Sequence, residues 1–235
     1  QTAWQSNWSY RGQRGENDPD DPELLPRFVK GQAVAAGIKN IGFSLGYQEN
    51  SWAQVELRGS DQLEEAIVRI AGADVGQGHH TVMAQIAAEV LDLELDQVRL
   101  EVSDTAFTES SGSASASRLT MLAGNAVKEA AEFALRKWRN EDRPALAEAT
   151  YLAPKTTRFD PETGYCVPNF AYGYVAQMAE VTVDTETGLV TVDRVVCADD
   201  VGRAVNPDLV VGQIEGCIVQ AHGYALLEDF RTQKG

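Results

Sequence analysis

Apolar and polar residues follow regular intervals along the first half of the chain. Residues 53–57 and 66–71 are short apolar-rich runs joined by a polar turn, a pattern that predicts a β-hairpin. Between residues 79 and 91 the apolar residues recur every four positions from Val82 to Val90, which predicts an amphipathic helix. The same reasoning predicts a strand and a turn in residues 32–46, a strand at 97–102 and a longer helix at about 118–138.

The second half repeats part of this order. Residues 175–183 and 189–197 predict a second hairpin, which is followed by a loop and by a helix that begins near Pro207. Residues 139–170 hold four prolines and indicate mainly connecting structure. We therefore predict an α+β fold of two similar lobes, each a β-hairpin or small sheet followed by a glycine loop and packed helices. The predicted divisions are an irregular lead-in at 1–30, a first lobe at 31–138, the connecting segment, and a second lobe at 171–235.

Composition and charge exclude several classes of protein. The chain has 235 residues, 43% of them hydrophobic, which is typical of a globular protein and excludes wholesale disorder. Its net charge of -15 disfavours non-specific binding to nucleic acid or to an anionic membrane. The longest uncharged stretch near the C-terminus, residues 216–227, is too short and too polar to span a bilayer. The N-terminus lacks a signal-peptide pattern and three scattered cysteines form no disulfide framework, so a cytoplasmic location is expected.

The loop GADVGQG at residues 72–78 is the first candidate site. Glycines let backbone N–H groups approach a ligand closely, and the following helix N-terminus carries about half a positive charge, so the loop is suited to an anion. The order of its glycines matches neither a Rossmann nor a P-loop motif. The alternative is a tight turn without a ligand. Gln77 offers both a donor and an acceptor to a ligand; alternatively it faces solvent.

A second candidate site follows the serine-rich loop at residues 103–117. Ser115, Ala116, Ser117 and Arg118 precede the second helix, where hydroxyls, free N–H groups and a guanidinium are suited to phosphate. The alternative is simple N-capping by Ser117. Gln213 lies beside a small-residue face in the last predicted helix.

The histidines and cysteines give weaker signals. Adjacent His79 and His80 suggest a metal site, but neighbouring side chains diverge on a helix and no third ligand is suitably spaced, so helix surface is the alternative. Cys166, Cys197 and Cys217 are expected to pack as small hydrophobic residues.

Four segments together resemble the molybdenum-binding subunit of the xanthine dehydrogenase and aldehyde oxidase family. They are GADVGQGHHTVMAQIAAEVL at 72–91, the loop at 104–118, GNAVKEAAEFAL at 124–135, and DDVGRAVNPDLVVGQIEGCIVQAHGYALLED at 199–229. The resemblance covers roughly residues 28–230. One departure is Ala221, where the family commonly has glycine, and it affects only local packing.

The resemblance implies a molybdopterin cofactor, whose dithiolene holds the molybdenum without protein ligands. Val75, Gly76 and Gln77 would lie at the oxo face of the metal, and Gly78 would complete that loop. Ser115, Ala116, Ser117 and Arg118 would cradle the pterin or its phosphate, and Gln213 would contact the pterin. The cofactor could carry a cytosine dinucleotide.

The implied protein is a multisubunit oxidoreductase that hydroxylates an aldehyde or heteroaromatic carbon with oxygen from water. The family's catalytic glutamate is expected beyond Gly235, so no catalytic residue is assigned in this chain, and neither Glu215 nor Glu228 replaces it. The implied partners are the remaining molybdenum-subunit lobes, an iron–sulfur subunit and an FAD subunit, and the chain alone is expected to be inactive. Two alternatives remain open: a non-catalytic assembly module of the same fold, and a zinc protein using His79, His80 and a cysteine.

Overall fold

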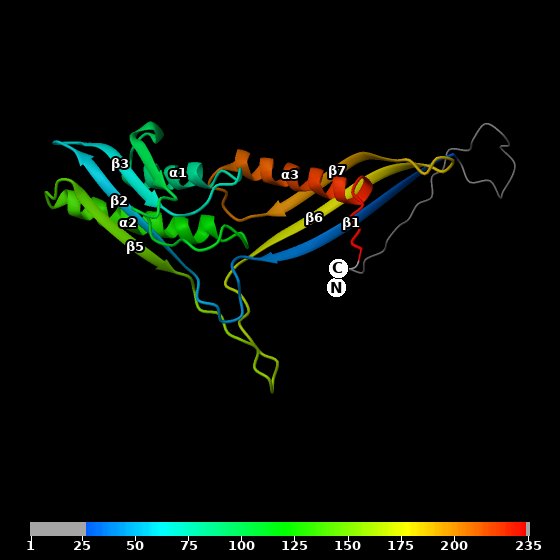
Figure 1. The fold of residues 1–235 in the computed structure, drawn as a ribbon, viewed down its shortest axis with the longest axis horizontal. Coiled ribbons are helices and arrows are strands. Elements are labelled where there is room, and N and C mark those ends of the chain that lie inside the picture. The colour runs from blue at the N-terminus through cyan, green and yellow to red at the C-terminus, as the bar shows by residue number, and fades with distance from the viewer. Residues whose placement is uncertain (1–26, 234–235) are drawn as a thin grey trace. The chain divides into compact units, whose positions relative to one another are not determined.

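The computed structural model describes residues 27–233, which fall into two compact units (Figure 1). Residues 39–172 and 203–213 form the four-stranded unit, and residues 27–38, 173–202 and 214–233 belong to the three-stranded unit. The predicted lead-in at 1–30 lies largely outside the described residues. Its last residues, from Phe28, already belong to strand β1 (Phe28–Asn40).

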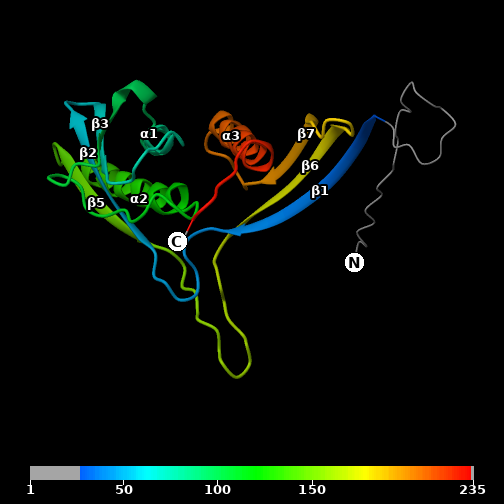
Figure 2. The ribbon, with the colours of Figure 1, turned by 45° about the vertical axis from the view of Figure 1, so that its right-hand side comes forward.

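The four-stranded unit combines a mixed sheet with two helices (Figure 2). Its strands are β2 (Asn50–Gly59), β3 (Leu63–Ile70), β4 (Val98–Val102) and β5 (Ala145–Leu152), in the order β4-β3-β2-β5. β2 runs antiparallel to β3 and β5, whereas β4 runs parallel to β3. A parallel pair needs a crossover, which α1 (His79–Leu91) and the short helix η1 (Leu95–Gln97) supply. Helix α2 (Leu119–Arg139) then leads to β5.

The core of this unit lies between one face of the sheet and both helices. Alternate residues Ala53, Val55 and Leu57 of β2 are fully buried, because strand side chains point to opposite faces in turn. They form one cluster with the apolar stripes of α1 and α2. The two helices approach closely at Gly124, where an added Cβ would lie 2.8 Å from Cδ1 of Ile86. Close packing therefore accounts for a glycine in the middle of a long helix.

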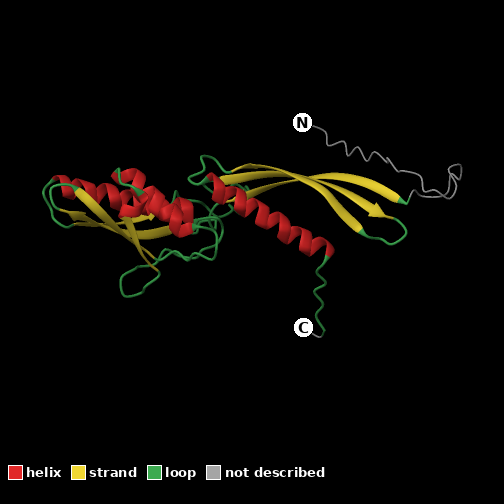
Figure 3. Ribbon diagram, turned by 90° about the horizontal axis from the view of Figure 1, so that it is seen from above, coloured by secondary structure: helices red, strands yellow, loops and turns green. Residues whose placement is uncertain are grey.

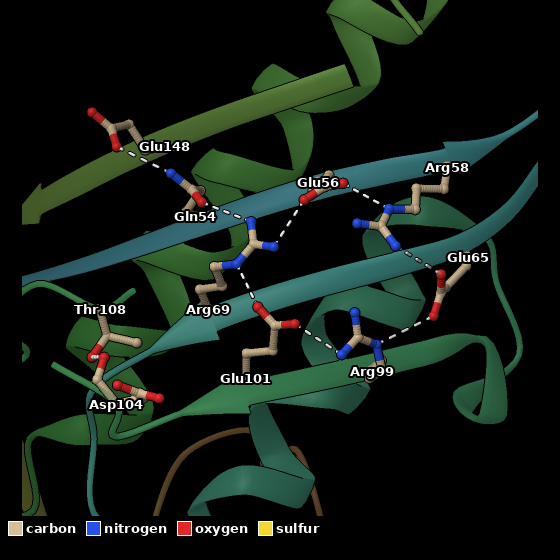
Figure 4. A network of polar contacts seen from close by, with 10 residues as sticks. All are labelled: Gln54, Glu56, Arg58, Glu65, Arg69, Arg99, Glu101, Asp104, Thr108 and Glu148. Carbon is tan, nitrogen blue, oxygen red and sulfur yellow. Dashed lines mark hydrogen bonds and ion pairs between the residues drawn. The ribbon is translucent and has the colours of Figure 1, made fainter. Parts of the chain in front are cut away.

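The strands of this sheet also carry a lattice of ion pairs (Figure 4). Arg69 is at its centre, with Nε 2.6 Å from Glu101 and a terminal nitrogen 2.8 Å from Glu56. Partial burial raises the pKa of Glu56, but the guanidinium groups of Arg58 and Arg69 together lower it by more, so the pKa lies below its usual value. The carboxylates of Glu56, Glu65 and Glu101 each pair with a guanidinium, so the charges of these ion pairs largely cancel within the lattice.

The sequence prediction missed strand β5, which lies in the segment expected to connect the lobes. Its inward residues Ala145, Ala147 and Ala149 are small and poor strand formers, and Pro144 precedes them, so the hydrophobic signal was weak. Pairing with β2 over eight residues nevertheless makes it a regular edge strand.

The three-stranded unit is a sheet in the order β1-β6-β7. Figure 3 shows its strands as long yellow arrows. β6 (Tyr172–Asp184) and β7 (Val190–Asp200) form the predicted second hairpin, and helix α3 (Pro207–Leu226) follows as expected. The predicted first lobe begins at residue 31, whereas β1 pairs with β6, so most of β1 belongs to this unit. From residue 214 onward α3 also belongs to this unit, where it and the sheet line an apolar groove of about 400 Å³. None of the described helices is long and apolar enough to cross a membrane.

Candidate functional site

The site begins where strands β2 and β3 separate beyond their paired residues. The last pair there is Ala53 with Ile70, and the residues that follow, Trp52 and Ala71, lie beyond the paired register. Instead the Ser111 hydroxyl lies between them: it accepts from the Ala71 N–H at 3.4 Å and donates to the Trp52 carbonyl at 3.3 Å. The serine-rich loop is thereby fixed to the base of the glycine loop.

A buried ion pair anchors the same loop. The Arg118 side chain is 3% exposed and its Nε donates to Oε2 of Glu49, whose side chain is fully buried. The terminal nitrogens donate to the carbonyls of Ser111 at 2.6 Å, Ser113 at 3.1 Å and Asn50 at 2.6 Å. The guanidinium expected to meet a phosphate therefore points inward, and its described bonds hold the loop to the start of β2.

The glycine loop at 72–78 is closed around the carboxylate of Asp74. Its Oδ1 accepts from the N–H groups of Gly76 at 2.9 Å and Gly78 at 3.3 Å, and its Oδ2 accepts from the His80 N–H at 3.1 Å. Partial burial raises the pKa of Asp74, but these three bonds and the nearby His80 lower it more, so the net pKa is below its usual value. The anion predicted at the N-terminus of α1 is thus supplied by the protein itself.

Gln77 and Val75 lie at the tip of this loop. The Gln77 carboxamide accepts from the Val75 N–H at 2.6 Å and donates to the Ala73 carbonyl at 2.8 Å, so both of its ends bond within the loop. The Val75 side chain is 82% exposed. Gly76 has a φ of 105° with open space at its Cβ position, which leaves its backbone accessible.

Residues 115–118 make a turn with a left-handed backbone. Ala116 and Ser117 have φ values of 55° and 52°, which are uncommon for residues other than glycine. The Ala116 carbonyl accepts from the Gly42 N–H at 2.9 Å, which supports the turn. Ser115 and Ser117 are exposed, and α2 begins after Arg118 without a side-chain cap. The alternative of N-capping by Ser117 is therefore not observed. Such non-glycine outliers concentrate at ligand-binding sites.

The start of α3 reaches the glycine loop in the same unit. Asn206 donates to Gln85 of α1 at 3.1 Å and caps α3 by accepting from the Leu209 N–H at 3.0 Å. The Leu209 side chain covers Gly78, where an added Cβ would lie 2.5 Å from Cδ1 of Leu209. Gln213 is exposed one turn further along. Residues four apart share a helix face, so Gln213 lies on the face that contacts the loop.

The two histidines have different surroundings. His80 bonds through Nε2 to the Gly72 carbonyl at 3.0 Å. His79 is buried, both of its ring nitrogens lack partners, and burial with a smaller effect of His80 lowers its pKa to about 4. The part of the chain that the structure describes holds no group of three His, Cys, Asp or Glu side chains placed to bind a metal ion, so it offers no support for a zinc site.

Comparison with known proteins identifies the family. The model of the molybdopterin cofactor-binding domain matches residues 3–147 and 135–235, which together span nearly the whole chain. The chain belongs to this domain family. More specifically, it is part of the molybdopterin-binding region of the xanthine dehydrogenase and aldehyde oxidoreductase family, as the resemblance in the sequence indicated.

Curated and solved relatives agree with this assignment. The aldehyde oxidoreductase of Megalodesulfovibrio gigas is 30% identical over 221 residues, covering 87% of this chain and 24% of the relative. The aldehyde oxidoreductase molybdenum-binding subunit PaoC of Escherichia coli is 31% identical, over 86% of this chain and 29% of the relative. The structure of the aldehyde oxidoreductase from Desulfovibrio desulfuricans superposes with a TM-score of 0.78 at 30% identity, over 88% of this chain and 24% of the other. The chain thus spans about a quarter of the length of these relatives.

Three residues central to the site were absent from the sequence prediction. Asp74 gave no ordinary N-cap signal, because it lies four residues before Gly78, the residue that immediately precedes α1. Glu49 and Ser111 also gave no signal, since their roles follow from the long-range pairing with Arg118 and with the separated strands.

Proposed function

We propose that the four-stranded unit binds molybdopterin as part of the molybdenum-binding subunit of a hydroxylase. The observation that carries this proposal is that three sequence-distant segments are joined at one end of the sheet. Ser111 connects the serine-rich loop to the base of the glycine loop, and Leu209 connects α3 to Gly78. All of the residues assigned from the resemblance lie in or beside these segments.

The groups presented by these segments fit a pterin cofactor. The exposed hydroxyls of Ser115 and Ser117 and the uncapped N-terminus of α2 offer donors to a phosphate or to pterin polar atoms. The open backbone at Gly76 permits close approach of a flat ring. A cofactor that brings its own metal ligands requires hydrogen-bond donors from the protein rather than metal-binding side chains.

The residues have distinct proposed roles. Val75 and Gly76 would face the metal end of the cofactor, and Gln77 would exchange its bonds within the loop for bonds to the cofactor. Gln213 would contact the pterin. Arg118 would not contact the cofactor itself but would hold the turn at residues 115–117 in place. When bound, the cofactor supplies the two-electron redox chemistry by which an aldehyde or heteroaromatic carbon is hydroxylated with oxygen from water.

The whole enzyme is proposed to include further lobes of the molybdenum subunit together with iron–sulfur and FAD partners. Its relatives are much longer than this chain, and we expect the chain alone to be inactive. The cytosine dinucleotide form of the cofactor and a cytoplasmic location remain predictions. The competing hypothesis is an assembly module that keeps this fold without a cofactor.

A matched pair of variants tests the proposed site. Gln77→Ala removes the carboxamide at the loop tip, whereas Gln62→Ala removes the same group from the exposed β2–β3 turn. Cofactor content is measured as molybdenum and oxidised pterin per chain in the complex with its partner subunits. The proposal predicts a loss with Gln77→Ala and none with Gln62→Ala. Equal content in both variants and in the wild type would refute the role of Gln77.

A further inference from the structure

Asp74 directs the conformation of the glycine loop from inside it. One carboxylate bonds to the backbone of Gly76, Gly78 and His80, which spans the tip of the loop and the first turn of α1. Gly76 and Gly78 have φ values of 105° and 76°, a region that glycine adopts without strain. The carboxylate therefore selects one backbone path among the many that a glycine-rich segment can follow.

The position of this carboxylate also affects which ligands the loop accepts. The N-terminus of a helix attracts anions through its free N–H groups and its partial positive charge. At α1 the negative charge of Asp74 already occupies this position. A second anion there would find these N–H groups already bonded to Asp74 and would be repelled by its negative charge.

We propose that Asp74 is a positioning residue that shapes the loop for the cofactor and closes the N-terminus of α1 to the cofactor's phosphate. The phosphate is then left to the turn at residues 115–117, where α2 begins without an acidic residue in its first turn. The effect of Asp74 on cofactor binding rests on the proposed function, whereas its effect on the loop conformation does not.

The backbone amides themselves provide the first test. Amide exchange and ¹⁵N chemical shifts of Gly76, Gly78 and His80 are measured by NMR in the wild type, Asp74→Asn and Asp74→Ala. Asp160→Asn is the matched control, because Asp160 accepts from the N–H groups of Glu162 and Thr163 in another turn of the same unit. We expect all three amides to lose protection with Asp74→Ala and to change little with Asp160→Asn. Unchanged amides in a folded Asp74→Ala variant would overturn the inference.

Small anions distinguish positioning from a general structural role. Formate added to Asp74→Ala is expected to restore protection of the three amides, and inorganic phosphate is expected to shift them in this variant but not in the wild type. Neither response follows if Asp74 only fills space. Failure of both anions to act on the variant, or phosphate binding to the loop of the wild type, would overturn the inference.

Cofactor binding separates this inference from the proposed function. In the complex with the partner subunits, Asp74→Asn is expected to lower molybdopterin affinity by about tenfold, as for other residues that orient a ligand-binding group. Wild-type protein without cofactor would refute the proposed function and leave the amide result intact. Normal cofactor affinity in Asp74→Asn and Asp74→Ala would refute the positioning role alone.

Discussion

Replacing Arg118 by alanine tests the buried ion pair that supports the candidate site. The Arg118 and Glu49 side chains are 3% and 0% exposed, and the guanidinium makes four hydrogen bonds, three of them to loop and strand carbonyls. Arg118→Ala removes these bonds and leaves the Glu49 carboxylate buried without a countercharge. Removing one partner of such a pair costs about 3–5 kcal/mol. That is a large part of the about 5–15 kcal/mol that stabilises a typical domain.

The free energy of unfolding is measured by urea denaturation followed by circular dichroism. Arg139→Ala is the control, because Arg139 is exposed in the last turn of α2, and its effect should stay within about 0.5 kcal/mol. The double variant Glu49→Leu with Arg118→Met removes both charges and should be more stable than Arg118→Ala. A loss below about 1 kcal/mol with Arg118→Ala would refute the reasoning.

Three further predictions concern the glycine loop and the ion-pair lattice of the four-stranded sheet. Gly72→Ala should lower the free energy of unfolding by about 1–3 kcal/mol, because the added Cβ would lie 2.1 Å from Nε2 of His79. Gly212→Ala is the control and should not destabilise the chain, because the Cβ position there is open space. Equal stability of the two variants in urea would contradict this prediction. The His79 ring should titrate near pH 4 in the folded chain, as measured by NMR. Between pH 6.5 and 4 the unfolded chain takes up a proton at His79 that the folded chain does not, so the folded chain loses stability as the pH falls through about this range. Titration near pH 6.5 would show that the ring is solvated. The lowered pKa of Glu56 means that its ion pairs stabilise the folded chain above pH 4.5, and this stability is lost as the pH falls through the pKa of the folded state. Glu56→Gln should therefore make the acid side of the pH–stability curve shallower. An unchanged curve would contradict the contribution of this lattice.

Local periodicity predicted most of the elements because their apolar residues face one core. Helix α1 occupies the predicted residues 79–91, where every turn contributes to the buried cluster. Strand β5 escaped prediction because its inward alanines give little hydrophobic signal and its pairing with β2 lies far along the chain. The placement of β1 beside β6 also depends on long-range pairing, which no local pattern encodes.

The candidate site was predictable in its segments but not in the orientation of its side chains. The glycine spacing located the loop at 72–78, and the structure joins its base to the serine-rich loop through Ser111. The inward direction of Arg118 could not be predicted, because it depends on Glu49, a residue 69 positions away. Likewise, the helix N-terminus favoured an external anion, whereas Asp74 supplies an internal one.

Cofactor binding by this chain can be measured as the molybdenum and pterin content of the chain purified with its partner subunits from its own host. Mass spectrometry measures the metal, and the fluorescence of the oxidised pterin measures the cofactor. We predict about one molybdenum and one pterin per chain, as a single cofactor site requires. Absence of both from an intact, folded assembly would contradict cofactor binding and favour a module of this fold that holds no cofactor.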